Sequence, residues 1–313
     1  MLARLATPLE AALVCCALCG CTAAKPHVKP LVEVDAIFDV PREYRVLTSL
    51  PCAEGAGLVY LFSSSGALYS FDPDSLKTRR IGDLDCSARG QPFSMAVDRA
   101  GVAWLNFKGG ALFHASIRDA KCKPVARYEP RQRGFVNFGM AFTSTGPDLS
   151  EETLFVWTGR PWWRPTVAGA GPGLASIDQK TLVTMPLGHD GPANSVRRGE
   201  LTGTGDGRLF AFIDTRPPRL AELEQTNGHV KSQRLLPSLD IGIGAFAFSF
   251  WGGDFFFYTS TGYGTNSRVH KLSTRAGTVT QVVDDIGFTI VGAGVSTCAP
   301  TGAKRGRTVE TVD

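Results

Sequence analysis

One pattern of four short strands recurs along most of this chain. From Phe93 onward, each copy has an apolar strand, an aromatic-rich strand, a strand led by leucine and a final strand, separated by turns. The apolar first strands are anchored at positions 45, 61, 45 and 44 residues apart, namely Met95, Met140, Leu201, Phe246 and Ile290. A period of roughly 40–50 residues with about four strands is typical of a β-propeller.

The third strands give a second measure of the same repeat. Their anchors are separated by 44, 62, 46 and 49 residues, at Leu68, Leu112, Leu174, Leu220 and Val269. Both series place the long step in the third copy. An accidental repeat would not place its irregularity twice in the same copy.

The two ends of the repeat complement each other. The first copy starts with the aromatic-rich strand at 58–64 and lacks an inner strand, whereas the apolar strand at 288–297 has no strand after it. Pairing them would close the ring and protect its edges. We therefore predict an all-β, five-bladed propeller over residues 51–300, followed by a disordered tail at 301–313. A six-bladed ring that also uses residues 31–50 is the alternative.

The N-terminal residues predict that the protein is exported to the cell envelope. Arg4 precedes an apolar stretch from Ala11 to Leu18. That stretch suits a secretory signal and is too short to span a bilayer. It ends in Leu18-Cys19-Gly20-Cys21, which resembles a bacterial lipobox. The resemblance implies cleavage after residue 20 and acylation of the Cys21 thiol by fatty acids such as palmitate; an ordinary signal peptide is the alternative.

The residues around the cleavage point extend this prediction. Thr22 is not the Asp that would favour retention in the inner membrane, so we expect an outer-membrane lipoprotein. A single acyl chain holds a protein only marginally, and a lipoprotein normally carries more than one. Residues 21–50 read as the lipidated cysteine and a tether between the membrane and the propeller.

Four cysteines remain beyond the signal peptide and Cys21. An even number in an oxidising compartment suggests two disulfides. Cys298 ends the last inner strand and Cys52 precedes the first aromatic-rich strand, so we predict a Cys52–Cys298 bond at the closure. Cys86 and Cys122 would then pair by elimination, although ideal propeller geometry puts one near each face. Four buried thiols are the alternative.

The extra length of the third copy contains the candidate binding residues. The segment at 159–173 joins its second and third strands and contains Arg160, Trp162, Trp163 and Arg164. Tryptophan and arginine dominate binding hot spots, and tryptophan faces also suit sugar rings. The alternative is that one tryptophan caps the channel and the other covers a blade.

The remaining chemistry-bearing residues predict no catalytic site, metal or cofactor. The five histidines are scattered without metal-ligand spacing, and no nucleophile elbow occurs. Turn formation explains the acidic residues near the first turn of each copy better than calcium binding does. Glu200 is the one carboxylate candidate on an inner strand. A net charge of +4 without a dense basic run argues against nucleic acid as a partner.

Three motifs resemble one group of bacterial proteins. They are ELTGTGDGRLFAF (200–212), FAFSFWGGDFFFYT (246–259) and GFTIVGAGVSTCAP (287–300). The likeness, over roughly residues 52–300, is to propeller lipoproteins and secreted proteins of myxobacteria and related bacteria. It implies a propeller fold but brings no activity with it, and the tryptophan pair is not part of the pattern.

The combined prediction is a lipid-anchored, non-catalytic propeller that binds an envelope protein or glycan. Two alternatives belong to other classes. A propeller enzyme of the lactonase or lyase type would need several carboxylates converging in the channel. A structural accessory of an envelope complex would have no ligand of its own.

Overall fold

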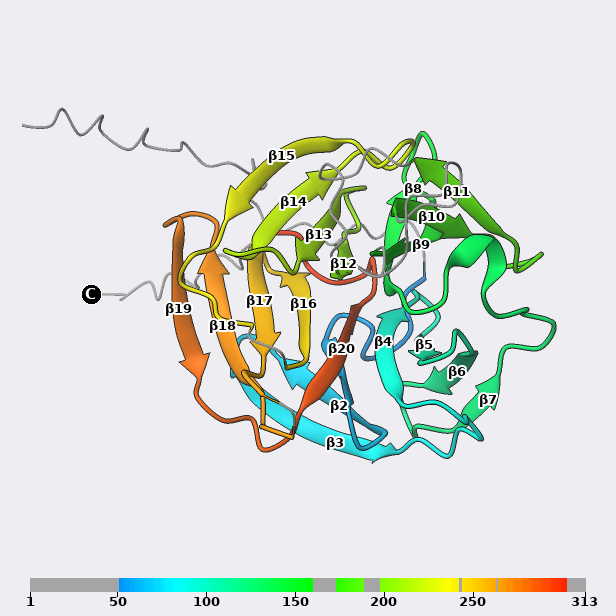
Figure 1. Cartoon of the computed structure of the whole chain (residues 1–313), viewed down its shortest axis with the longest axis horizontal. Coiled ribbons are helices and arrows are strands. Elements are labelled where there is room, and N and C mark those ends of the chain that lie inside the picture. Colours follow the sequence, from blue (N-terminus) through cyan, green and yellow to red (C-terminus); the bar gives the residue numbers. More distant parts are fainter. Residues whose placement is uncertain (1–50, 160–172, 189–197, 242–243, 263, 303–313) are drawn as a thin grey trace, which may run out of the picture. The chain divides into compact units, whose positions relative to one another are not determined.

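The computed structural model describes residues 51–159, 173–188, 198–241, 244–262 and 264–302, which form a ring of five antiparallel sheets (Figure 1). Each sheet is a blade of four strands. Residues 1–50 and 303–313 lie outside the described residues, as does Cys21. Among the described residues, no helix is long and apolar enough to cross a membrane.

The blades follow the chain, apart from the first. Blade 1 has the strand order β20-β1-β2-β3, with bounds Ile290–Val295, Val59–Ser63, Ala67–Asp72 and Lys77–Asp83. Blade 2 comprises β4 (Pro92–Val97), β5 (Val102–Phe107), β6 (Leu112–Ser116) and β7 (Cys122–Pro124). Blade 3 comprises β8 (Gly139–Thr145), β9 (Glu151–Thr158), β10 (Gly173–Ile177) and β11 (Thr184–Gly188). A 3-10 turn, η1 (Gln132–Gly134), precedes β8.

Blades 4 and 5 complete the ring. Blade 4 comprises β12 (Gly199–Gly203), β13 (Leu209–Ile213), β14 (Arg219–Leu223) and β15 (Val230–Leu235). Blade 5 comprises β16 (Phe246–Trp251), β17 (Asp254–Thr259), β18 (Arg268–Ser273) and β19 (Thr278–Val283). The inner strands β20, β4, β8, β12 and β16 contact one another in turn around the ring. The five-bladed prediction is therefore confirmed.

The core is divided among the five spaces between neighbouring blades. Alternate residues of a strand point to opposite faces of its sheet. In β4, Met95 and Val97 accordingly pack toward blade 1, whereas Ala96 packs toward blade 3. Each inner strand is thus buried on both faces, which explains why these segments read as continuous apolar runs rather than alternating ones.

The predicted closure is present. β20 pairs antiparallel with β1, with Gly294 opposite Tyr60 and Ala293 opposite Leu61. The predicted Cys52–Cys298 disulfide lies beside this pairing, with a Cα separation of 6.1 Å. The two ends of the ring are therefore joined both by backbone hydrogen bonds and by a covalent bond.

The Cys86–Cys122 disulfide is also confirmed, with a Cα separation of 5.0 Å. Ideal geometry would have placed these residues near opposite faces. Because sheets twist, the outer strands run obliquely around the ring, and the chain leaving β3 passes toward the start of β7 (Figure 1). The Asp85 carboxylate accepts a hydrogen bond from the Cys122 amide at 3.0 Å, which holds the two segments together.

Candidate functional site

The predicted binding residues Arg160, Trp162, Trp163 and Arg164 lie outside the described residues. The strands on either side show where their segment attaches. β9 ends at Thr158 and β10 begins at Gly173, so the segment connects the second and third strands of blade 3. The other candidate sites are polar clusters and a groove formed by the described residues.

A buried carboxyl group lies on the inner strand of blade 4. Glu200 is 5% exposed, and its Oε2 accepts a hydrogen bond from Ser94 Oγ at 2.6 Å. Ser94 belongs to blade 2, so this bond joins the inner strands of two blades that are not neighbours. Gly139 of blade 3 packs against the backbone of Glu200, where an added Cβ would stand 2.6 Å from the Glu200 Cα. The glycine allows the inner strands of blades 3 and 4 to approach closely.

The surroundings of Glu200 favour its neutral form. Burial raises the pKa of the carboxyl group well above its usual value, and neither the Ser94 hydroxyl nor the charge of Arg198 offsets this effect. The single carboxyl predicted on an inner strand is therefore found there, bonded across the ring to a hydroxyl. Several converging carboxylates, which a lactonase-type site would need, are not found among the described residues of these strands.

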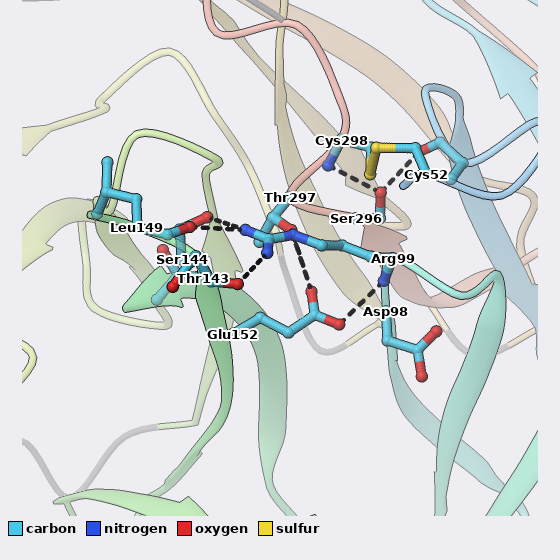
Figure 2. A network of polar contacts seen from close by, with 12 residues as sticks. Cys52, Asp98, Arg99, Thr143, Ser144, Leu149, Glu152, Ser296, Thr297 and Cys298 are labelled. Carbon is cyan, nitrogen blue, oxygen red and sulfur yellow. Dashed lines mark hydrogen bonds and ion pairs between the residues drawn. A yellow bond between two sulfur atoms is a disulfide. The ribbon is translucent and has the colours of Figure 1, made fainter. Parts of the chain in front are cut away.

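A second polar cluster surrounds Arg99, in the turn between β4 and β5 (Figure 2). Its Nε donates a hydrogen bond to Thr297 Oγ1 at 2.6 Å. Nη1 donates to the Ser150 carbonyl at 2.9 Å, and Nη2 donates to Ser144 Oγ at 2.6 Å and the Leu149 carbonyl at 3.1 Å. One guanidinium group thus connects blade 2 to blade 3 and to the segment that follows β20.

Glu152 completes this cluster. Its Oε1 accepts the Arg99 amide at 3.0 Å, and its Oε2 accepts the Thr297 hydroxyl at 3.0 Å and lies 3.7 Å from Arg99 Nε. The two charged side chains are only 13% and 14% exposed. Burial raises the pKa of Glu152, and the hydrogen bonds from the Arg99 amide and Thr297 counter it only in part. We conclude that the cluster is structural, because these bonds occupy its polar atoms.

The segment after β20 crosses one end of the ring. Residues 296–302 are all buried. Thr297 contacts blades 2 and 3 through Arg99 and Glu152, while the Pro300 carbonyl accepts the Gly252 amide of blade 5 at 2.8 Å. Ser296 Oγ donates to the Ala56 carbonyl at 2.8 Å. The channel is therefore covered at this end by the chain itself.

A shallow polar groove lies between blades 3 and 4. It encloses about 260 Å³ and is lined by Ser144, Leu149, Gly207, Arg208, Glu222 and Lys231 among others. Arg208 and Glu222 form a bidentate ion pair on its wall, with N–O distances of 3.1 and 2.8 Å. Lys231 Nζ lies 3.9 Å from the same carboxylate, so the charges of Arg208, Lys231 and Glu222 are engaged with one another and the groove can admit a small polar group.

The acidic residues near the turns pair with neighbouring protein groups. Asp98 accepts the Val102 amide at 2.9 Å and the Trp104 indole at 3.2 Å, which fixes the β4–β5 turn. Asp206 accepts the Thr204 hydroxyl, and Asp254 pairs with Lys271 at 2.8 Å. Within the described part of the chain, no three His, Cys, Asp or Glu residues gather as a metal site would require.

Sequence reasoning missed the cluster around Arg99. Arg99 occupies a turn of ordinary composition, and Glu152 lies in a polar segment between two apolar strands. Their partners are 45–198 residues away along the chain. The one signal in the sequence was that Arg99, a polar residue, follows an inner strand. That signal does not identify the residues that Arg99 contacts.

Comparisons with known proteins found similar folds among solved structures only. No family model matches the chain, and neither does any curated protein. Among solved structures, the dihydro-heme d1 dehydrogenase NirN is 13% identical over 80% of this chain and 50% of its own, with a TM-score of 0.36. TolB from Acinetobacter baumannii is 11% identical over 76% and 65%, with a TM-score of 0.39.

A third solved structure is a protein of unknown function from Bacteroides thetaiotaomicron. It is 10% identical over 84% of this chain and 70% of its own, with a TM-score of 0.45. The present chain spans half the length of NirN and less than two thirds of TolB. At these identities the likeness concerns the fold and carries no function to this chain.

Proposed function

We propose that this chain is a lipid-anchored envelope protein whose propeller is a non-catalytic platform for binding a protein or a glycan. The supporting observation is that the polar side chains near the axis of the ring are already bonded to other protein groups. Glu200 is buried, Arg99 and Glu152 are largely buried, and all three are hydrogen-bonded within the ring, while residues 296–302 cover one end of the channel. Binding is therefore left to the connections and the outer rim, which is how propellers serve as platforms.

The anchor is proposed from the lipobox-like Leu18-Cys19-Gly20-Cys21. Two disulfides in the described residues support maturation in an oxidising compartment outside the cytoplasm. The test is labelling with an alkyne fatty acid, followed by separation of membrane and soluble fractions. We expect labelled, membrane-bound wild type and an unlabelled Cys21→Ser variant. A Cys21→Ser variant that is still acylated would contradict the anchor.

The proposed binding region is the connection at 160–172, with Trp162 and Trp163 as its contact residues. Crosslinking and pull-down from envelope fractions should compare wild type with Trp162→Ala plus Trp163→Ala. Leu235→Ala is a matched control because Leu235 is 51% exposed on blade 4. We expect the double variant alone to lose the crosslinked partner. Equal recovery from all three proteins would remove this connection from the proposal.

A further inference from the structure

The connection between β7 and β8 presents three arginines to solvent. Arg127, Arg131 and Arg133 are all exposed. The apolar residues between and around them are buried in the core cluster that joins blades 2 and 3, namely Val125, Tyr128, Phe135 and Phe138. The connection is therefore fixed from beneath while its cations point away from the core.

The backbone at these arginines is unusual. Their φ angles are 66°, 70° and 52°, in the left-handed region that disfavours side chains larger than glycine. Four other non-glycine residues of the described chain share this conformation: Leu76, Ala120, Leu149 and Leu182. Those four are buried or half-buried, so packing compensates for the strain. The exposed arginines gain no such packing, which indicates a role beyond the fold.

Two neighbouring turns add further cations beside these arginines. Arg131 Nε donates a hydrogen bond to the Gly109 carbonyl at 3.4 Å, next to the exposed Lys108. Lys108 Nζ donates to Gln91 Oε1 at 2.8 Å, and its carbonyl lies against Gly90. The exposed Arg89 precedes that glycine. We call Arg89, Lys108, Arg127, Arg131 and Arg133 the basic strip.

The positive charge of the basic strip is not balanced locally. None of its five cations forms an ion pair with another described residue, whereas exposed cations elsewhere do, as in Arg268–Asp284 and Lys121–Asp119. Glu129 is the one exposed carboxylate within the β7–β8 connection. Unpaired like charges are unfavourable at this density, and an anionic partner would relieve their repulsion.

Gln132 holds the strip in place between Arg131 and Arg133. Its Nε2 donates to the Leu182 carbonyl at 2.9 Å, and its Oε1 accepts the Thr184 amide at 2.9 Å. The side chain therefore pairs with the edge of β11 as a strand would. This attachment gives the two arginines a fixed spacing relative to blade 3.

We propose that the basic strip binds a linear anionic glycan, with a carboxylate, sulfate or phosphate group at regular intervals. Four of its five cations are arginines, whose planar forks bind such groups through two hydrogen bonds. The strip extends over three connections instead of lining a pocket, which suits a polymer. This inference goes beyond the proposed function, because it involves neither the lipid anchor nor residues 160–172.

A membrane surface is the alternative that the structure favours less. Val183 and Met185 flank the Gln132 contact and are 46% and 47% exposed. Two half-exposed aliphatic side chains offer little apolar area, whereas proteins that lie on bilayers bury a broad apolar face with aromatic residues. Substitution of these two residues can nevertheless distinguish binding to a membrane from binding to a glycan.

The experiment uses the full chain with Cys21→Ser, which cannot be acylated at that position. Its affinity is measured for heparin, polygalacturonate and neutral dextran at several salt concentrations. We expect binding to both polyanions that weakens with salt, and none to dextran. Because it removes two of the five cations and adds two negative charges, Arg131→Glu plus Arg133→Glu should weaken binding at least roughly tenfold. Failure to bind either polyanion would overturn the proposal.

Three matched variants separate charge, folding and membrane effects. Lys77→Glu plus Arg79→Glu makes the same charge change on exposed β3 and should leave the affinity within about twofold. Arg131→Gly plus Arg133→Gly should lose affinity while keeping a Tm at least as high as wild type. The proposal is wrong if the β3 variant loses as much affinity. It is also wrong if phosphatidylglycerol vesicles bind better than the polyanions and Val183→Ser plus Met185→Ser abolishes that binding.

Discussion

The Ser94 hydroxyl donates a hydrogen bond to the Glu200 carboxyl group at 2.6 Å, although the two residues are 106 positions apart and lie in blades that are not neighbours. Glu200 is buried, and its pKa is well above the usual value of 4.5 because burial disfavours the charged form. A carboxyl group whose pKa is raised by folding binds its proton more tightly in the folded state. Stability must therefore fall as pH rises from the unfolded pKa toward the folded one.

Glu200→Gln should remove this pH dependence. Each pH unit between the two pKa values costs the wild type up to about 1.4 kcal/mol, and glutamine has no proton to lose. Urea unfolding at pH 4, 6 and 8 should show that the free energy of unfolding of the variant increases relative to that of wild type as pH rises. Glu129→Gln, at an exposed site, is the control. An unchanged pH profile in Glu200→Gln would show that Glu200 is not the group responsible.

Removal of Arg99 should be strongly destabilising. Arg99→Met leaves the largely buried Glu152 without its ion-pair partner, and such a loss costs up to about 3–5 kcal/mol when a pair is fully buried. Arg99→Met plus Glu152→Leu should recover part of that loss, because no uncompensated charge remains. Chemical unfolding measures both variants, with Arg268→Met at a largely exposed ion pair as control. A double variant less stable than Arg99→Met would refute this account of the cluster.

The two disulfides should contribute unequally to stability. Their half-cystines are 246 and 36 residues apart, so the chain-entropy model assigns about 5.5 kcal/mol to Cys52–Cys298 and about 3.8 kcal/mol to Cys86–Cys122. Replacing each pair with serine and measuring the free energy of unfolding tests the order. Equal losses would mean that the β1–β20 pairing already restrains the closure in the unfolded ensemble.

Gly139→Ala should disrupt the contact between the inner strands of blades 3 and 4. The added methyl group would lie 2.6 Å from the Glu200 Cα, against backbone that cannot move aside. Overpacking of this kind costs typically 1–3 kcal/mol, and occasionally more. Gly262→Ala is the control, since its added Cβ has only ordinary contact with Thr265 at 3.5 Å. Thermal unfolding of the two variants should differ clearly, and equal Tm values would contradict the prediction.

The sequence predicted the blade count, the closure and the Cys52–Cys298 disulfide because these depend on the repeat, whereas Cys86–Cys122 was predicted by elimination alone. β20 and β1 have the same apolar pattern as the corresponding strands of the other blades, so the pairing of these two strands follows from matching the copies. The Ser94–Glu200 bond and the Arg99 cluster could not be predicted from the repeat. They join residues of different copies, and their positions depend on glycines and turns that vary from blade to blade.

The arginines of the β7–β8 connection illustrate a different limit. Residues 127–133 contain three arginines separated by other residue types, and they form no dense basic run. Their left-handed backbone, and the contact of Arg131 with the Gly109 turn beside Lys108, are visible only in the folded chain. Charge that is dispersed along the chain can thus converge on a rim, a rearrangement that composition does not reveal.

The shared sheet of blade 1 has a consequence for folding. β1 lacks its inner neighbour until β20 pairs with it, and the four other blades lie between these two strands in the sequence. Blade 1 is therefore complete only when the intervening blades bring the two strands together. A ring that fails to close would leave the β1 edge open to pairing with another chain.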